Sequence, residues 1–364
     1  MQNNIYKSKV AIVGAAGFVG IELVNQIQFL EEFEVFAITR DNGSFLLEGK
    51  KVQIISINDA TKYGPFDFVI NLAYPTSLEP HFYPEVNLQI LDSVKRLVSL
   101  NTKLIQVSTQ AVFGYEMDKP ISSSFVKMHR DFAYIESKIE MENLFLKSFS
   151  NNDITIVRLG NVWGAGSGGW TAAILNRLLF GKYVGVEGLN GYANMTDVIN
   201  VADYLIFLLK NMPSGKSISH LAEFSNMKWN DIVFLMANEL KVKPIMSDKL
   251  PEIGNSLIFE LKKTISFPSY GDIYRKLMAH RIGGSYLRQL VRILGRGKFS
   301  KLKKGEIRIL PANASLDSDD TTFLTVITAK EQFNSDTISG WTPKILFEKS
   351  WDNIKTWMYE VGYL

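Results

Sequence analysis

Cysteine is absent from this chain, and histidine occurs only four times among its 364 residues. The absence of cysteine excludes disulfide bonds, thiolate zinc sites and a cysteine nucleophile, and it fits a reducing compartment. The four histidines show no metal-binding spacing, so no metal site is expected. They are His81, His129, His220 and His280.

Long hydrophobic runs and a strong charge imbalance are also absent. No run reaches the ~18 apolar residues that a membrane span needs, and the N-terminal segment lacks the apolar core of a signal peptide. We therefore expect a cytoplasmic protein. A formal net charge of +3 gives no reason to expect nucleic-acid binding. The content of 46% hydrophobic and 21% charged residues is typical of globular proteins.

In the first 165 residues, short apolar runs alternate with helical patterns. This alternation predicts parallel strands joined by right-handed helical crossovers, with helices on both faces of the sheet. The expected strands are 10–13, 34–38, 51–57, 68–72, 103–108 and 154–159, with helices over 18–30 and 86–100. After Gly164 the pattern changes, and residues 166–191 and 221–364 predict a smaller mixed α/β unit. A segment around 192–220 is expected to return to the first domain.

The segment KVAIVGAAGFVG (9–20) joins an apolar strand to the start of a helix through three glycines. Gly14 permits a tight turn, Gly17 lets the backbone approach a pyrophosphate, and Gly20 lets the helix pack closely on the sheet. The helix that opens with Phe18 and Val19 offers free N–H groups to the phosphates. Residues 1–165 are therefore expected to form a dinucleotide-binding domain with a doubly wound parallel sheet of the Rossmann type.

The end of the second expected strand bears on which dinucleotide binds. In FEVFAITRDN, Arg40 is placed to pair with a 2′-phosphate, which favours NADP. The alternative is that Arg40 is solvated and Asp41 binds the ribose of NAD. Asp59 follows the third expected strand, where it is placed either to accept a hydrogen bond from the adenine amine or to cap a helix.

Tyr134 and Lys138, in YIESK, lie four residues apart on one face of an expected helix. An ammonium near a phenol favours the phenolate and lowers the phenol pKa. The phenol can then exchange a proton with a carbinol oxygen while hydride moves to a nicotinamide. Ser108 and Thr109 end another expected strand at the carboxyl edge of the sheet, where open α/β sheets bind ligands.

Several motifs, taken in order, resemble the extended short-chain dehydrogenases/reductases, the NAD(P)-dependent epimerase/dehydratase group. They are GAAGFVG (14–20), NLA (71–73), VSTQAVFG (107–114), YIESK (134–138) and RLGNVWG (158–164), and the tail over 339–358 is similar as well. The resemblance covers nearly the whole chain, apart from about 265–335.

The resemblance implies roles for the matching residues. Thr109 matches the catalytic hydroxyl, Tyr134 the general acid/base, and Lys138 the residue that lowers its pKa and holds the nicotinamide ribose. The other expected positions are Ser108 and Asn161 at the substrate, Leu72 and Ala73 at the cofactor, and Asn87 in a mostly structural role.

Two departures from the family pattern narrow the expected reaction. The family's sugar 4,6-dehydratases carry an Asp-Glu pair where this chain has Gln110 and Ala111, so water elimination lacks its proton carriers. Epimerases that use a cysteine–histidine pair are excluded. We expect reduction of a nucleotide-activated keto-sugar, with 4-epimerisation through a transient ketone as the alternative. A reductase of a non-sugar ketone and a nucleotide-binding protein without turnover are further alternatives.

The substrate's phosphates have no obvious partner in the family-like segment. That segment often carries an arginine, but its counterpart here, near Ala193 and Asn194, has none. Residues 270–304 carry ten Lys/Arg and one acid, so Arg288 and Arg292 are expected to bind the phosphates. The alternatives are a solvated helix pair and weak attraction to an anionic membrane, which would suit a lipid-linked sugar. A homodimer is expected, paired through helices around 86–100 and 134–149.

Overall fold

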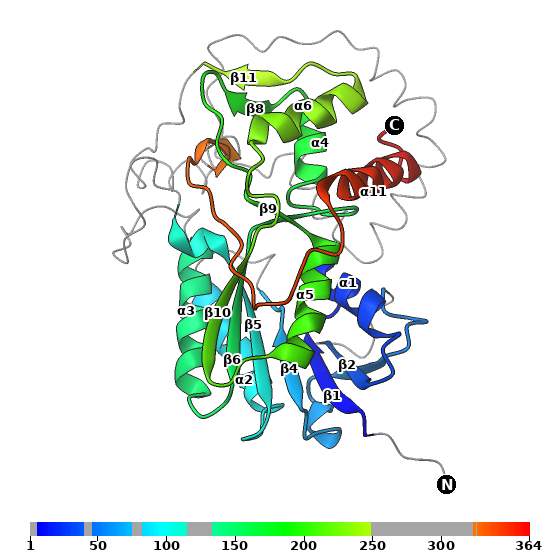
Figure 1. Ribbon diagram of the computed structural model, residues 1–364, viewed down its shortest axis with the longest axis vertical. Helices are drawn as coiled ribbons and strands as arrows, with labels where there is room; N and C mark the ends of the chain where they lie inside the picture. Colours follow the sequence, from blue (N-terminus) through cyan, green and yellow to red (C-terminus); the bar gives the residue numbers. More distant parts are fainter. Residues whose placement is uncertain (1–5, 40–45, 75–81, 115–132, 249–322, 325) are drawn as a thin grey trace.

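The computed structural model describes residues 6–39, 46–74, 82–114, 133–248, 323–324 and 326–364, and its largest sheet has seven parallel strands (Figure 1). The strand order is β10-β6-β5-β4-β1-β2-β3. Their bounds are β1 (Ser8–Val13), β2 (Phe33–Thr39), β3 (Gln53–Ser56), β4 (Phe68–Asn71), β5 (Lys103–Thr109), β6 (Ile154–Leu159) and β10 (Lys216–Leu221). The predicted doubly wound sheet of the Rossmann type is therefore confirmed.

The order of the strands reverses at β1. β1 pairs with β2 on one side and with β4 on the other, so the chain winds outward in both directions from this point. In open parallel sheets, ligands bind at the carboxyl ends of the strands beside such a switch point. The ends of β1, β4 and β5 are adjacent there, and each carries a motif that the sequence singles out.

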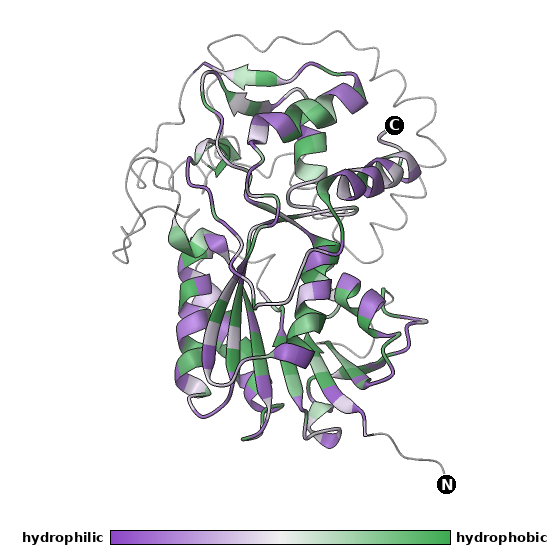
Figure 2. Ribbon diagram, in the orientation of Figure 1, coloured by the Kyte–Doolittle hydropathy of each residue, from purple (hydrophilic) through white to green (hydrophobic). Residues whose placement is uncertain are grey.

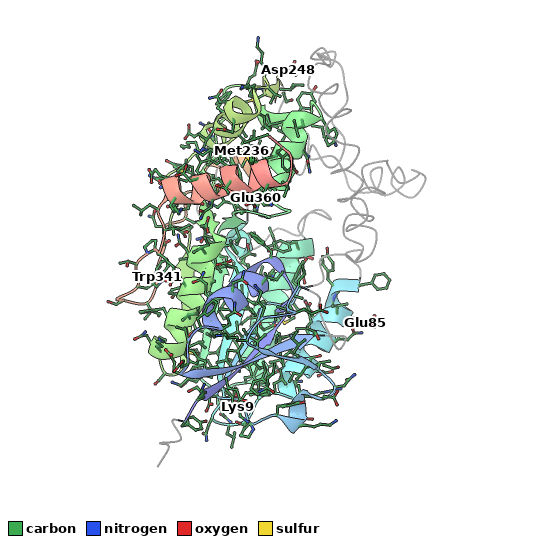
Figure 3. All side chains as sticks on the ribbon, turned by 90° about the vertical axis from the view of Figure 1, so that its right-hand side faces the viewer. Lys9, Glu85, Met236, Asp248, Trp341 and Glu360 are labelled. Atoms are coloured by element: carbon green, nitrogen blue, oxygen red, sulfur yellow. The ribbon has the colours of Figure 1, made fainter. Side chains whose placement is uncertain are left out.

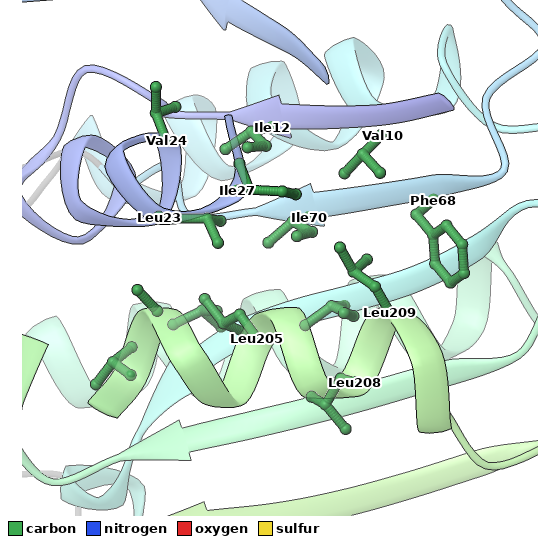
Figure 4. Packing of buried hydrophobic residues seen from close by; sticks show 14 of the residues in the cluster. Val10, Ile12, Leu23, Val24, Ile27, Phe68, Ile70, Leu205, Leu208 and Leu209 are labelled. Atoms are coloured by element: carbon green, nitrogen blue, oxygen red, sulfur yellow. The ribbon is translucent and has the colours of Figure 1, made fainter. Parts of the chain in front are cut away.

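Helices cover both faces because the strands are apolar on both sides. Val10 and Ile12 of β1 pack in one hydrophobic core, whereas Ala11 and Val13 pack in the other. The first face is covered by α1 (Phe18–Ile27) and α5 (Val198–Asn211), and the second by α2 (Tyr83–Lys95) and α3 (Ala133–Ser148). Figure 4 shows Leu23 of α1 and Leu205 and Leu209 of α5 in one cluster with Ile12 and Ile70 of the sheet.

A further hydrophobic core lies beyond the carboxyl ends of the strands. It is built from α4 (Ala172–Leu179), β8 (Tyr183–Val186), α6 (Trp229–Leu240), β11 (Ile245–Ser247) and α11 (Phe347–Glu360). The short strands β7 (Asn161–Trp163) and β9 (Met195–Asp197) pair with each other, and Figure 1 places β9 between this unit and the sheet. Figure 2 shows mainly hydrophilic residues on α11 and hydrophobic ones along the large sheet. The division of the chain into dinucleotide-binding and substrate domains stays a prediction.

Each strand expected in the first 165 residues is present, with ends shifted by at most two residues. The helix expected over 18–30 ends at Ile27, and the one expected over 86–100 spans Tyr83–Lys95. Pro84 favours the earlier start, because proline is well accommodated in a first helical turn. Leu100 is 78% exposed, so no apolar contact extends the helix that far. β10 was not among the expected strands, since it is a polar edge strand.

None of the described helices combines the length and the hydropathy needed to cross a lipid bilayer. Most of the basic segment 265–335, including all of 270–304, lies outside the described residues.

A buried asparagine fastens the segment before α11 to α5. Asn200 donates from Nδ2 to the Ile345 carbonyl at 2.9 Å, and the Ile345 N–H donates to Asn200 Oδ1 at 2.9 Å. Nδ2 also donates to Glu223 Oε1 at 2.7 Å. Nearby, Trp341, which is labelled in Figure 3, donates from Nε1 to Asp203 Oδ2 at 2.9 Å. These bonds tie the last helix to the layer of α5.

Replacing Asn200 with leucine is expected to lower the free energy of unfolding by about 2–4 kcal/mol. Each polar group that loses its partner away from water costs about 1–3 kcal/mol. Denaturant unfolding followed by tryptophan fluorescence measures the change. Asn211→Leu is the matched control, because Asn211 lies exposed at the end of the same helix. Equal losses in the two variants would contradict the fastening role of Asn200.

Candidate active site

The turn between β1 and α1 requires residues without a side chain. Gly14 has φ +85°, and a Cβ atom there would lie 2.9 Å from the Ala73 backbone nitrogen. A Cβ atom on Gly20 would lie 2.5 Å from the Gly14 carbonyl oxygen. Gly17 donates its N–H to that oxygen at 3.0 Å and precedes α1 without a capping side chain. Such a helix start offers N–H groups to an anion, and here Phe18 is the first helical residue. Val19 follows it in the same turn.

The end of β4 lies against this turn. Leu72 donates its N–H to the Val13 carbonyl at 2.9 Å, and Ala73 donates to Asn71 Oδ1 at 3.2 Å. Asn71 in turn donates from Nδ2 to Gln106 Oε1 at 2.8 Å, across to β5. Leu72 and Ala73 therefore lie beside the glycine turn, where the resemblance places cofactor contacts.

The residues expected at the adenosine end are only partly described. Arg40 and Asp41 lie outside the described residues, directly after Thr39 ends β2. Asp59 precedes the short 3₁₀ helix η1 (Ala60–Lys62), but its side chain makes no capping hydrogen bond. Instead, Asp59 Oδ1 accepts from Lys62 Nζ at 2.6 Å. This partly exposed carboxylate thus pairs with a lysine rather than with the helix backbone.

Three polar residues follow one another where β5 ends. Thr109 Oγ1 accepts the Ala111 N–H at 3.2 Å and so starts the short 3₁₀ helix η3 (Gln110–Phe113). Ser108 Oγ and both amide atoms of Gln110 are buried and have no hydrogen-bond partner among the described residues. A buried polar group without a partner costs about 1–3 kcal/mol. A polar ligand at this edge would offset that cost.

Tyr134 and Lys138 lie one turn apart near the start of α3, at the same edge of the sheet. The Thr109 side chain lies close enough to Tyr134 to favour its phenolate, and Lys138 Nζ lies 5.9 Å from the centre of the Tyr134 ring. The structure therefore brings together the hydroxyl, the phenol and the ammonium that the sequence pattern links. Lys138 is buried, with an exposed fraction of 8%.

Burial shifts both titrating groups toward their neutral forms. It raises the pKa of the Tyr134 phenol, and the nearby Thr109 hydroxyl opposes this. It lowers the pKa of Lys138 to about 8, and the nearby Glu142 carboxylate opposes this. The sequence-based expectation of a lowered Tyr134 pKa is therefore wrong for the protein alone, because loss of hydration outweighs the favourable contacts.

An ion pair lies one turn farther along α3. Arg158 of β6 donates from Nε and Nη2 to the two carboxylate oxygens of Glu142, at 3.0 and 2.7 Å. The Arg158 guanidinium lies 5.1 Å from the Phe113 ring, which stacks on His220 at 5.2 Å. Two parallel hydrogen bonds fix the geometry of such a pair. This pair was not predicted from the sequence, although Glu142 follows Lys138 at helical spacing.

Asn87 connects the two helices on this face. Its buried Nδ2 donates to the Ser137 carbonyl at 3.0 Å and to Glu140 Oε2 at 2.8 Å. These bonds join α2 to α3 directly beside Lys138. Their geometry agrees with the mostly structural role that the resemblance implies.

Asn161 opens β7 beyond the end of β6. It donates from Nδ2 to the Ala193 carbonyl at 2.8 Å, and its N–H donates to the Asn194 carbonyl at 2.9 Å. Asn194 is buried and donates from Nδ2 to the Glu331 carbonyl at 2.8 Å, so it holds the returning chain. Arg288 and Arg292, the expected phosphate contacts, lie outside the described residues.

Tyr74 is a further residue at the carboxyl edge of the sheet, and it was not predicted from the sequence. It directly follows the NLA motif, and its ring centre lies 5.0 Å from that of Tyr134 and 5.7 Å from that of Tyr83. Both ring pairs meet edge to face. The motif match ends at Ala73, so the sequence pattern gives no signal for the next residue.

Relatives of the chain are sugar-modifying enzymes. An N-acetyl-alpha-D-glucosaminyl-diphospho-ditrans,octacis-undecaprenol 4-epimerase from Escherichia coli O157:H7 is 25% identical over 258 residues, which is 66% of this chain and 75% of that enzyme. A GDP-6-deoxy-D-talose 4-dehydrogenase from Aggregatibacter actinomycetemcomitans is 30% identical over 165 residues. That match covers 43% of this chain and spans about half of the relative, 54% of its length.

Solved structures show the same fold. UDP-glucuronic acid 4-epimerase from Bacillus cereus, in complex with UDP-glucuronic acid and NAD, superposes with a TM-score of 0.52. It is 18% identical, and the superposition covers 66% of this chain and 85% of that one.

The family model for the NAD dependent epimerase/dehydratase family matches residues 10–220, which is more than half of the chain. The match includes the glycine turn, the end of β5 and the Tyr134–Lys138 pair. The chain therefore belongs to the NAD dependent epimerase/dehydratase family and is an NAD(P)-dependent enzyme of the short-chain dehydrogenase/reductase type.

Proposed function

We propose that this enzyme transfers hydride between NAD(P) and C4 of a hexose carried on a diphosphate, and that its net reaction reduces a keto-sugar. The observation that carries the proposal is the meeting of Thr109, Tyr134 and Lys138 at the carboxyl edge of the sheet. The names of two relatives support C4 as the reacting carbon of the sugar. One is a 4-epimerase of a diphosphate-linked sugar, and the other is a 4-dehydrogenase of a GDP-sugar.

The residues around the glycine turn fit a dinucleotide, because close backbone approach leaves the start of α1 open to phosphates. Those that would hold it are Gly14, Gly17, Phe18, Val19 and Gly20 at the pyrophosphate, Leu72 and Ala73 beside it, Asp59 at the adenine and Lys138 at the nicotinamide ribose. Bound NAD(P) supplies or accepts the hydride. Arg40 supports NADP, with NAD held by Asp41 as the alternative.

The three polar residues then have distinct roles in the reducing direction. Tyr134 donates its phenolic proton to the carbonyl oxygen of the substrate. Thr109, which lies near Tyr134, is placed to orient the same oxygen. The Lys138 ammonium stabilises the phenolate that remains. The raised pKa of Tyr134 keeps the phenol protonated at neutral pH, as a proton donor requires.

Contacts to the sugar and its phosphates come from several strand ends. Ser108 near the end of β5 and Asn161 at the start of β7 are proposed to bind sugar hydroxyls, as is the buried Gln110 amide. Arg288 and Arg292 are proposed to bind the phosphates on the strength of the sequence alone. Homodimer formation and a weak membrane contact through 270–304 stay predictions.

A 4-epimerase is the second candidate, and the Escherichia coli relative favours it. In that reaction Tyr134 would first take the proton of the C4 hydroxyl and then return it, with the nucleotide retained throughout. A reductase and an epimerase thus need the same three side chains, and they differ in whether the nucleotide leaves.

The purified chain is expected to consume reduced nicotinamide when given a nucleoside diphosphate 4-keto-hexose. Tyr134→Phe should lower kcat at least ~100-fold, because it removes the proton donor. Tyr63→Phe, outside the site, should leave it unchanged. Loss of nicotinamide absorbance and mass spectrometry of the sugar measure the reaction. Interconversion of 4-epimers without net nicotinamide consumption would select the epimerase, and full activity of Tyr134→Phe would contradict both candidates.

The pH profile follows from the titration of Lys138. The reductive kcat/KM is expected to be level near neutral pH and to fall above about pH 8, where Lys138 loses the charge that stabilises the phenolate. Lys138→Arg keeps a cation across this range, so the variant should be slower but lack this decline. If kcat/KM of Lys138→Arg declines with the same midpoint pH as the wild type, the decline arises from the titration of another group.

Gly14→Ala is expected to weaken NAD(P) binding by tenfold or more, since the added carbon meets the Ala73 backbone and displaces the turn. Gly49→Ala is a matched control, because Gly49 also has a positive φ of +78° but would place its Cβ atom in open space. Nucleotide fluorescence titration gives the two affinities, and thermal melting checks folding. Equal weakening in both variants would argue against a cradle at Gly14.

A further inference from the structure

Tyr74 follows the end of β4 and lies between two helices. Its ring contacts Tyr83 of α2 and Tyr134 of α3, both edge to face. Its hydroxyl is buried. Ala73, the residue before it, lies 2.9 Å from the Cβ position of Gly14. Tyr74 therefore joins the glycine turn to the helix that carries the proposed proton donor.

The Tyr74 ring is also the nearest aromatic partner of the Lys138 ammonium in the described part of the chain. Lys138 Nζ lies 4.5 Å from the Tyr74 ring centre and 5.9 Å from that of Tyr134. A cation within about 6 Å of a ring centre is attracted by the negative face of the ring. Because Lys138 is buried, water weakens this attraction less than at the surface.

No carboxylate of the described residues forms an ion pair with Lys138. Glu142 lies one turn away on α3, but both of its oxygens accept hydrogen bonds from Arg158. Glu140, on the same helix, accepts from Asn87. Among the described residues, the charged and titratable groups of the elements around Lys138 are Tyr134, Glu140 and Glu142 on α3, Arg158 on β6, Tyr83 on α2 and Tyr74 after β4.

We propose that Tyr74 is a positioning residue of this site, whose ring face holds the Lys138 side chain in place and stabilises its positive charge. The inference rests on the proposed function of Lys138 and adds a neighbour that the family motifs leave out. The ring, rather than the hydroxyl, performs this role, because the ammonium lies over the ring.

Titration of Lys138 in the protein without substrate tests the ring directly. The rate of acetylation of Lys138 is measured against pH with dilute acetic anhydride, and the labelled peptide is quantified by mass spectrometry. Burial lowers the pKa of Lys138 to about 8. Tyr74→Leu removes the ring and should lower the midpoint by about one further unit, because the charged form loses its partner. Tyr74→Phe keeps the ring and should titrate as the wild type does.

Two further variants test whether a change in packing alone shifts the Lys138 midpoint. Tyr83→Leu removes the other ring that Tyr74 contacts and should leave the Lys138 midpoint unchanged. Tyr74→Met fills the space with an unbranched side chain, and it replaces Tyr74→Leu if that variant fails to fold by circular dichroism. An unchanged midpoint in the folded variant that lacks the ring, or an equal shift in Tyr74→Phe, would overturn the proposal.

The kinetic readout connects the ring to the reaction. In the variant that lacks the ring, the decline of the reductive kcat/KM should move to lower pH by the same amount as the acetylation midpoint. In Tyr74→Phe the decline should stay in place. If the chain reduces none of the keto-sugars tested, the proposed function fails, but the acetylation profile still decides the role of Tyr74. A shifted midpoint with an unshifted decline would overturn the link to catalysis.

Discussion

The burial of the Lys138 ammonium away from water is the physical constraint on which the geometry of this site depends. A buried charge is costly unless its surroundings compensate for it. Here the charge of Glu142 acts on Lys138, but both carboxylate oxygens of Glu142 are hydrogen-bonded to Arg158, and the ammonium lies over aromatic rings. The pKa of Lys138 falls to about 8, so its charge is retained at neutral pH but by a narrow margin. Small changes among its neighbours are therefore enough to change the protonation state of Lys138 at neutral pH.

The topology of the sheet brings those neighbours together from distant parts of the chain. β1, β4 and β5 are adjacent in the sheet, and their carboxyl ends carry Gly14, Tyr74 and Thr109 in that order. Asn87 then fixes α3 against α2, so Tyr134 and Lys138 meet the same edge. The glycine turn and the proposed proton donor on α3 are thus linked through the residues that follow β4.

The sequence was sufficient for the features that depend on local spacing. Strand and helix patterns predicted the sheet, and the family motifs predicted the meeting of Thr109, Tyr134 and Lys138. Tyr74 and the pair of Glu142 with Arg158 were missed, because their importance arises from contacts between segments far apart in the chain. The direction expected for the Tyr134 pKa shift was wrong for a related reason. Spacing identifies a charged neighbour, but it does not measure how completely folding removes water.

The charge balance around Lys138 also supports the proposed hydride transfer with a single proton donor rather than water elimination. Before reaction, Lys138 contributes one positive charge, while Glu142 and Arg158 neutralise each other. In the proposed reaction Tyr134 gives up its proton, and the phenolate and the ammonium then form a second neutral pair. Gln110 and Ala111 are buried and uncharged, so they leave this balance intact. A carboxylate at either position would add a buried negative charge to be compensated, and the amide of Gln110 instead offers hydrogen bonds without carrying a proton between substrate atoms.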